Sequence, residues 1–247
     1  MSENCFLITC EHGGNDIPRA YAGLFSSPGA KRDLISHRGY DPGSLQIGRE
    51  LSAALDAEII ASQTTRLLVD LNRSLHHPQL FSKYSSRLSA EERASLLSEH
   101  YHPYRTQVEG KIRSLLESSN RVVHLSVHTF TPRFRGTHRP LDLGILYDPN
   151  RREESRFSEQ VVTRLAFRSS ELSGPEFERL RLRVRHNEPY LGIDDGLTTH
   201  LRTQYPSPRY LGLEIEINNR YTRWQEKRKQ TLTAALANAI QRVPIEL

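Results

Sequence analysis

Two histidines stand at the ends of apolar runs that have the character of buried strands. His12 follows the apolar residues of "FLITCEHGG", and His128 follows those of "LSVHTFT". Ligands of open α/β sheets bind beyond the carboxyl ends of strands, and histidine is the commonest metal ligand. For either histidine alone, a buried hydrogen bond is the simpler explanation. As a pair with carboxylates nearby, they favour a metal site.

A hydrolytic zinc site takes three protein ligands and leaves one position for water. The third ligand is therefore expected to be a carboxylate or another histidine. On residue type and position alone, the candidates are Glu11, Asp16, His37 and Asp41.

Two carboxylates, Glu214 and Glu216, alternate along the apolar run "LGLEIEI". Residues i and i+2 of a strand face the same side, so both carboxylates share one face of the expected sheet. Burying both without partners is costly. The face is therefore either exposed to water, or it holds a glutamate that takes a proton from water beside a metal.

Polar residues surround a short apolar segment in "TRLLVDLNRS". Arg66 and Asp70 suit a structural ion pair. Asn72 and Arg73 at the end of the segment suit a fork that holds a substrate carboxylate. The turn-like loop "RHNEPYLG" adds two further candidate substrate-binding residues, Asn187 and Tyr190.

The elements that must position these side chains alternate between strands and helices. Strands are predicted at residues 6–10, 58–61, 67–71, 122–127, 143–147, 182–186 (an edge strand) and 211–217. Helices are predicted from residue 42 to about 55, from the Ser89–Glu92 capping box to about 118 with a pause at 102–104, and over 159–167 and 223–242. The order predicts an α/β fold with a central mixed, largely parallel sheet flanked by helices. Residues 169–175 are expected to form a surface loop, and residues 1–247 a single domain.

Composition restricts the class of protein. The 247 residues have a mean hydropathy of -0.59, and no apolar run reaches the ~20 residues that span a bilayer. No secretory leader is recognisable, and Cys5 and Cys10 are expected on opposite strand faces, so a cytoplasmic setting is predicted. The net charge is +5 and arginine greatly outnumbers lysine, which favours an anionic ligand. Nucleic acid is disfavoured, because no lysine-rich tail or RNA-binding motif is present.

The chain resembles the N-formylglutamate amidohydrolase family from about Cys10 to Tyr221. Seven short motifs occur in the family's order: "CEHGGNDIP", "HRGYDPGS", "TRLLVDLNRS", "YHPYR", "SVHTFTP", "RHNEPY" and "LEIEINN". The resemblance implies a phosphorylase/hydrolase-like α/β fold similar to zinc carboxypeptidases and to the aspartoacylase and succinylglutamate desuccinylase group. It also implies a metal-dependent amidohydrolase acting on an N-acyl amino acid.

Carried over motif by motif, the resemblance assigns roles to single residues. His12 and His128 are the implied metal ligands. Glu216 of the "EIN" segment resembles the general base of zinc carboxypeptidases. Arg73, which ends the "DLNR" motif, is expected to hold a substrate carboxylate or the oxyanion.

The third ligand is where the family pattern breaks. Carboxypeptidase relatives use a glutamate three residues after the first histidine, and that position is Asn15 here. Asp41 of "YDPGS" matches a family aspartate and is the expected ligand, with Asp16 as the alternative.

These residues predict a zinc amidohydrolase that holds one divalent metal and cleaves a small anionic N-acyl amino acid such as N-formylglutamate. Glu216 and Arg73 are expected to be catalytic, and the expected substrate-binding residues are Arg66, Asn72, Asn187 and Tyr190. The "EHGG" opening differs from the "PHSG" type of the histidine-degradation enzyme, so the acyl group stays open. The alternative is a non-catalytic protein on the same scaffold that binds an acidic partner or nucleic acid.

Overall fold

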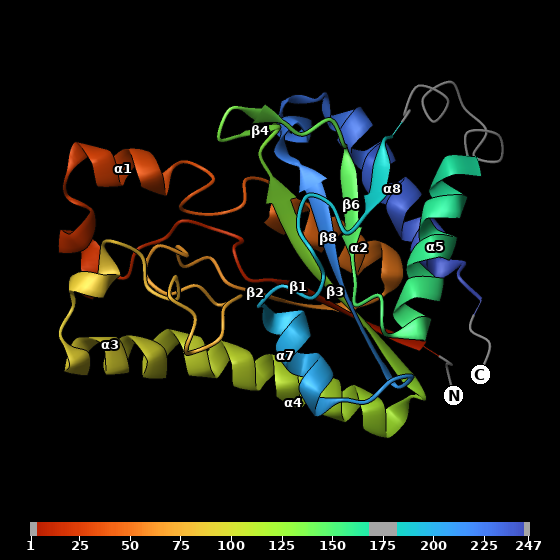
Figure 1. Ribbon diagram of the computed structural model, residues 1–247, viewed down its shortest axis with the longest axis horizontal. Coiled ribbons are helices and arrows are strands. Elements are labelled where there is room, and N and C mark those ends of the chain that lie inside the picture. The colour runs from red at the N-terminus through yellow and green to blue at the C-terminus, as the bar shows by residue number, and fades with distance from the viewer. Residues whose placement is uncertain (1–3, 168–181, 245–247) are drawn as a thin grey trace.

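A six-stranded sheet forms the centre of the computed structural model, which describes residues 4–167 and 182–244 (Figure 1). The strand order is β2-β1-β3-β8-β6-β7. All neighbouring strands are parallel except β6 and β8, which are antiparallel. The strands are β1 (Asn4–Cys10), β2 (Glu58–Ala61), β3 (Arg121–Phe130), β6 (Leu143–Leu146), β7 (Val184–His186) and β8 (Tyr210–Asn218).

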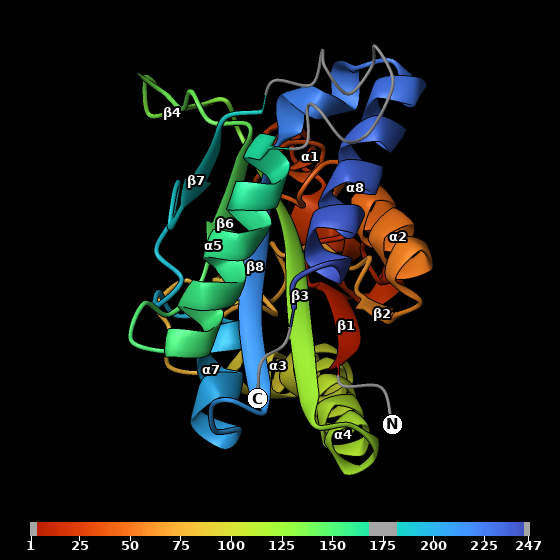
Figure 2. The same ribbon diagram turned by 90° about the vertical axis from the view of Figure 1, so that its right-hand side faces the viewer.

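Helices cover both faces of this sheet (Figures 1 and 2). One face packs against α2 (Ser44–Leu55), α5 (Arg152–Phe167) and α8 (Glu226–Gln241). The other packs against α3 (Ala90–Leu96), α4 (His102–Ser118) and α7 (Leu197–Gln204). The remaining elements are α1 (Pro28–Leu34), the 3-10 helices η1 (Arg19–Phe25), η2 (Ser85–Arg87) and η4 (Asn219–Arg223), the π-helix η3 (Leu97–Tyr101), and a hairpin of β4 (Arg133–Phe134) and β5 (Thr137–His138).

Alternation along the two central strands explains where polar groups gather. In β3 all ten residues are buried, and Val123, Leu125 and Val127 enter the core under α2 and α8. The intervening residues, among them Ser126 and His128, face the other side of the sheet. Strand β8 has the same phase, with its apolar residues in that core and its glutamates on the polar face. The centre of the sheet thus has one apolar and one largely polar face.

Most predicted elements are confirmed, and with them the α/β class. The Ser89–Glu92 capping box is present. The predicted pause at 102–104 is misplaced: these residues begin α4, and the irregular turn is the π-helix η3 just before them, which joins α3 to α4. The strand at 58–61 has the predicted bounds, and β7 is an edge strand. Residues 169–175 lie outside the described residues.

Three further details of the prediction are wrong. Residues 67–71 are buried but form turns, because Leu67, Leu68, Val69 and Leu71 fill the core beneath α4 without pairing to the sheet. Helix α5 begins at Arg152, seven residues before the predicted start at 159. Helix α2 begins at Ser44, after Pro42, and has Gly43 as its N-cap at φ 88°. No helix within the described ranges is long and apolar enough to span a membrane.

Candidate metal centre and active site

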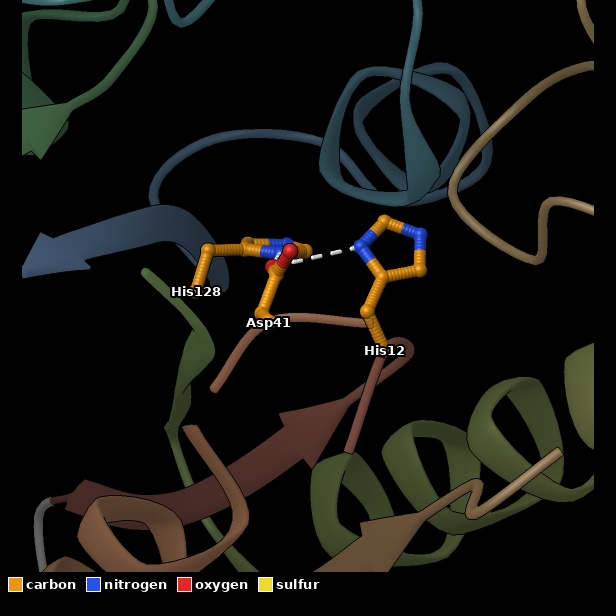
Figure 3. A group of neighbouring side chains, drawn as sticks. All are labelled: His12, Asp41 and His128. Carbon is orange, nitrogen blue, oxygen red and sulfur yellow. Dashed lines mark hydrogen bonds and ion pairs between the residues drawn. The ribbon is translucent and has the colours of Figure 1, made fainter. Parts of the chain in front are cut away.

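His12, Asp41 and His128 come together at the carboxyl ends of β1 and β3 (Figure 3). His12 follows β1, His128 lies on β3, and Asp41 lies in the loop before α2. The Asp41 amide donates a hydrogen bond to the carbonyl oxygen of His12 at 2.9 Å, which fixes this loop against the end of β1. All three side chains are buried, and one ligand atom from each lies within 4.8 Å of the other two.

The geometry of this group suits a small divalent cation. Asp41 Oδ2 lies 3.3 Å from His12 Nδ1 and 2.9 Å from His128 Nδ1. Ligand atoms on a zinc ion at ordinary bond lengths are about 3.3 Å apart in a tetrahedron. Two imidazole nitrogens and one carboxylate oxygen are also a donor set that hydrolytic zinc sites use. The residues present therefore fit a zinc ion.

A second carboxylate lies behind each histidine. His12 Nε2 is 2.7 Å from Asp70 Oδ1, and His128 Nε2 is 3.2 Å from Glu11 Oε2. Asp70 is itself held by the Arg66 guanidinium at 2.6 Å. Carboxylates that bind the distal nitrogen of a ligating histidine fix its ring and raise its basicity.

The charges in this group favour a cation at its centre. Burial acts to raise the pKa of Asp41, but the charge and hydrogen bond of His12, together with His128 and Arg66, hold that pKa well below its usual range. Burial acts to lower the pKa of His128, yet its hydrogen bonds to Asp41 and Glu11 hold that pKa well above its ordinary value. The surrounding carboxylates stabilise positive charge here, whether a proton or a metal ion supplies it.

Glu216 is a buried carboxyl group beside this centre. It is directly opposite His128 in the β3–β8 register, and its side chain is buried with Oε2 making no hydrogen bond. Burial raises the pKa of Glu216 to about 8, against the opposing charge of His128 and with the help of Asp41 and Glu214. The arrangement holds a carboxyl group that is ready to exchange a proton at neutral pH.

Glu214 shares the face of Glu216 but differs in its surroundings. Its Oε1 accepts a hydrogen bond from Thr198 Oγ1 at 2.8 Å. No ion pair of Glu214 is found among the described residues. Its hydroxyl partner leaves Glu214 less suited than Glu216 to take a proton.

A single cavity of about 1170 Å³ brings most of the predicted residues together. Its lining includes His12, Asp41, Arg66, Asn72, Arg73, His128, Tyr190, Glu214 and Glu216. The predicted Arg66–Asp70 ion pair is present, and Arg66 also reaches Asp41 at 3.4 Å. Arg73 donates to the Asp195 carbonyl oxygen at 2.5 Å.

A comparison with family models identifies the family of this chain. The model of the N-formylglutamate amidohydrolase family matches residues 4–222. The chain belongs to this family. Membership indicates an amidohydrolase of the N-formylglutamate type. Among curated proteins the chain has no match.

Two solved structures are similar over nearly the whole chain. A gene product of Agrobacterium tumefaciens is 28% identical, with a TM-score of 0.77 over 95% of this chain and 88% of its own. An N-formylglutamate amidohydrolase from Ralstonia eutropha is 17% identical, with a TM-score of 0.69 over 96% of this chain and 91% of its own. The second likeness shows a shared fold.

Three other candidates from the family motifs lie differently. Asn187 is not part of the cavity lining; it has φ 50°, and its Oδ1 accepts the amides of Tyr147 and Gly192 at 3.0 and 3.1 Å. Asp16 is exposed, makes a backbone bridge to Thr64, and is not in the metal-ligating group. His37 lines the cavity from an exposed position.

Sequence reasoning missed how this family member supports its histidines. The sequence indicates Glu11 only as a possible metal ligand. In the structure it lies behind His128 and accepts hydrogen bonds from Ser126 Oγ at 2.6 Å and Tyr104 Oη at 3.0 Å. Ser126 could have been found, because residues i and i+2 of a strand share a face. Nothing local in the sequence shows that Asp70 reaches His12.

Proposed function

We propose that this family member is a metal-dependent hydrolase that cleaves the amide bond of an N-acyl amino acid such as N-formylglutamate. One observation carries the proposal. The zinc-like donor set of His12, Asp41 and His128 faces the same cavity as the unpartnered carboxyl oxygen of Glu216. Metal ligands beside a base of raised pKa are the components that amide hydrolysis by water requires.

In this proposal His12, Asp41 and His128 hold the ion. When bound, a zinc ion supplies a Lewis acid for the amide carbonyl and lowers the pKa of water toward ~7. Positive charge at this centre favours the carboxylate form of Glu216. Glu216 then takes a proton from the attacking water and delivers a proton to the leaving amine.

Arg73 is proposed to bind a carboxylate of the substrate. One nitrogen of the Arg73 guanidinium donates to the Asp195 carbonyl oxygen. The Tyr101 hydroxyl donates to the backbone carbonyl oxygen of Arg73 at 2.7 Å. These contacts hold the residue at the cavity and leave other guanidinium donors for a ligand. Arg66 forms ion pairs with Asp70 and Asp41, so we assign it to holding these carboxylates in place beside the metal centre. Asn72 and Tyr190 line the space for substrate.

We also propose a cytoplasmic setting for this reaction. Cys5 and Cys10 lie on one strand and are not joined by a disulfide, which suits a reducing compartment.

Metal content of a ligand variant tests the proposed centre. Asp41→Asn removes the carboxylate between the two imidazoles, whereas Asp16→Asn is the matched control in an exposed position of the same region. Protein purified without chelator is expected to carry about one zinc per chain in the parent and in Asp16→Asn, and to lose it in Asp41→Asn. Full occupancy in Asp41→Asn by elemental analysis would refute the ligand assignment.

A further inference from the structure

One side of the cavity is formed by a surface of which the reaction above uses only Tyr190, as lining of the substrate space. We call it the distal wall: Arg133, Phe134 and Arg135 of the β4–β5 hairpin, with Tyr190 and Leu191 of the loop after β7. Its apolar members are open to solvent within the cavity, Phe134 at 39%, Tyr190 at 41% and Leu191 at 53% exposure. The hairpin lies beyond the end of β3 (Figure 1).

Arg139 joins the two parts of the distal wall. Its guanidinium carbon lies 4.6 Å from the ring centre of Phe134 and 5.0 Å from that of Tyr190. It also donates a hydrogen bond to the Tyr190 hydroxyl at 3.1 Å. The hairpin is closed by Arg135 and Gly136, both at positive φ, as a two-residue turn requires. The wall is therefore held in place by specific contacts.

The distal wall carries positive charge on Arg133 and Arg135. Within the described ranges, Arg133 and Arg135 have no carboxylate partner. Two other cations of the lining differ in this respect, since Arg38 and Lys83 both pair with Asp33, at 2.8 and 3.0 Å. The guanidinium of Arg135 also lies 5.3 Å from the ring centre of Phe134, so the wall presents partly exposed aromatic rings among guanidinium groups, two of which have no carboxylate partner in the described residues.

The cavity is larger than a small N-acyl amino acid requires. A volume of about 1170 Å³ exceeds the ~300–1,000 Å³ of pockets that hold drug-sized ligands. A substrate as small as N-formylglutamate fills a small part of it. With the amino-acid carboxylate assigned to Arg73, the distal wall is left for the acyl side of the substrate.

We propose that the distal wall binds the acyl group of the substrate, and that this group is an aromatic one with a carboxylate at its far end. The proposal rests on the amide hydrolysis proposed above. An aryl ring packs against the exposed parts of the Phe134 and Tyr190 rings, and its carboxylate pairs with Arg133 and Arg135. In the reaction, water adds across the C–N bond: its oxygen joins the acyl carbon, and a proton goes to the departing amine.

A series of amides with a common glutamate tests the substrate class. The series is N-formyl-, N-acetyl-, N-benzoyl- and N-(4-carboxybenzoyl)-L-glutamate, with kcat/KM measured on the zinc-loaded protein. The benzoyl compound is expected to exceed the acetyl compound by about tenfold through ring stacking, and the 4-carboxy group to add about tenfold more through charged hydrogen bonds. A rate that is highest for the formyl compound would overturn the proposal.

Variants locate the effect on the wall. The double variant Arg133→Gln, Arg135→Gln is expected to abolish the advantage of the 4-carboxy group and to leave the benzoyl rate within about twofold. Phe134→Ala is expected to lower both aromatic rates but not the acetyl rate. Arg113→Gln, on the exposed side of α4, is the control and changes none of them.

Binding of the acyl products separates this proposal from the hydrolytic one. By calorimetry, terephthalate is expected to bind at least tenfold more tightly than benzoate, and the double variant is expected to remove that difference. If no amide is hydrolysed but this binding pattern holds, the distal wall stands and the amidohydrolase function falls. If N-formylglutamate is hydrolysed but terephthalate binds no better than benzoate, the distal wall proposal is refuted and the hydrolase stands.

Discussion

The proposed chemistry depends on Glu216, whose Oε2 has no hydrogen-bond partner. Glu216→Gln keeps the shape of the side chain and removes its basicity, so the metal is expected to stay bound while kcat falls by about 10²–10⁴. Glu214→Gln is the matched control on the same strand face, since Glu214 is occupied by Thr198. The measurement is kcat of both variants at full zinc occupancy. An inactive Glu214→Gln beside an active Glu216→Gln would exchange the two roles.

Arg73 tests recognition of the substrate's charge. Arg73→Lys keeps the positive charge but loses the planar fork that pairs with a carboxylate, so KM for an N-acylglutamate is expected to rise about tenfold or more. Steady-state kinetics on the same substrate with its carboxylates converted to amides provides the comparison. Equal KM changes on the charged and the neutral substrate would argue that Arg73 only shapes the loop.

At this scale the sequence predicts the residues that lie at element ends, but not the contacts behind them. His12, His128 and Glu216 are recognisable because each follows or interrupts an apolar run. Asp70 is not, since its approach to His12 depends on how the turns of residues 67–71 fold back under the sheet. Contacts between distant segments leave no local pattern.

Two glycines within helices differ in the space around them: Gly48 of α2 is closely packed against the sheet, and Gly110 of α4 is not. A Cβ at Gly48 of α2 would lie 2.7 Å from Cys10 Sγ and 3.0 Å from Ile59 Cδ1, whereas one at Gly110 of α4 would meet nothing within 4 Å. Gly110→Ala is expected to raise the free energy of unfolding by about 0.5–1 kcal/mol. Gly48→Ala gains the same helix propensity but overpacks the contact of α2 with β1, so it is expected to be about 1–3 kcal/mol less stable than Gly110→Ala.

Urea unfolding gives the free energy of unfolding of each variant, and the two values can be compared if the m-values are equal. Equal stability of the two variants would show that α2 moves away from β1 at little cost.

The elements that sequence reasoning finds have a distinct apolar run or a recognisable spacing of apolar residues. Strands β1, β2, β3 and β8 and helix α8 are of this kind. Residues 67–71 have the apolar composition of a strand but end in buried turns, so composition alone misleads there. Helix α7 and the β4–β5 hairpin were missed, because both are short and rich in polar residues.

The whole molecule carries an electrostatic cost at its polar sheet face. In the metal-free protein, Glu216 has a pKa of about 8 in the folded state and close to 4.5 when unfolded. Between these values the folded state binds more protons, so stability falls as pH rises from about 4.5 to about 8. Relative to Glu216→Gln, the parent is expected to lose up to about 1.4 kcal/mol per pH unit in this window.

Chelator-treated parent, Glu216→Gln and the control Glu214→Gln are compared by urea unfolding at several pH values. The slope is expected in the parent and in Glu214→Gln only. Parallel curves for the parent and Glu216→Gln would contradict a neutral Glu216 in the folded protein.

The strand order has a consequence for synthesis on the ribosome. Within residues 4–167 and 182–244, β8 is the last strand along the chain, yet it lies between β3 and β6 at the centre of the sheet. Translation therefore delivers both histidines and Asp41 well before the strand that carries Glu216. Until β8 inserts, the long edge of β3 has no partner on that side and is open to pairing with other nascent chains. Slow translation between β3 and β8 should therefore favour aggregation of this protein over folding.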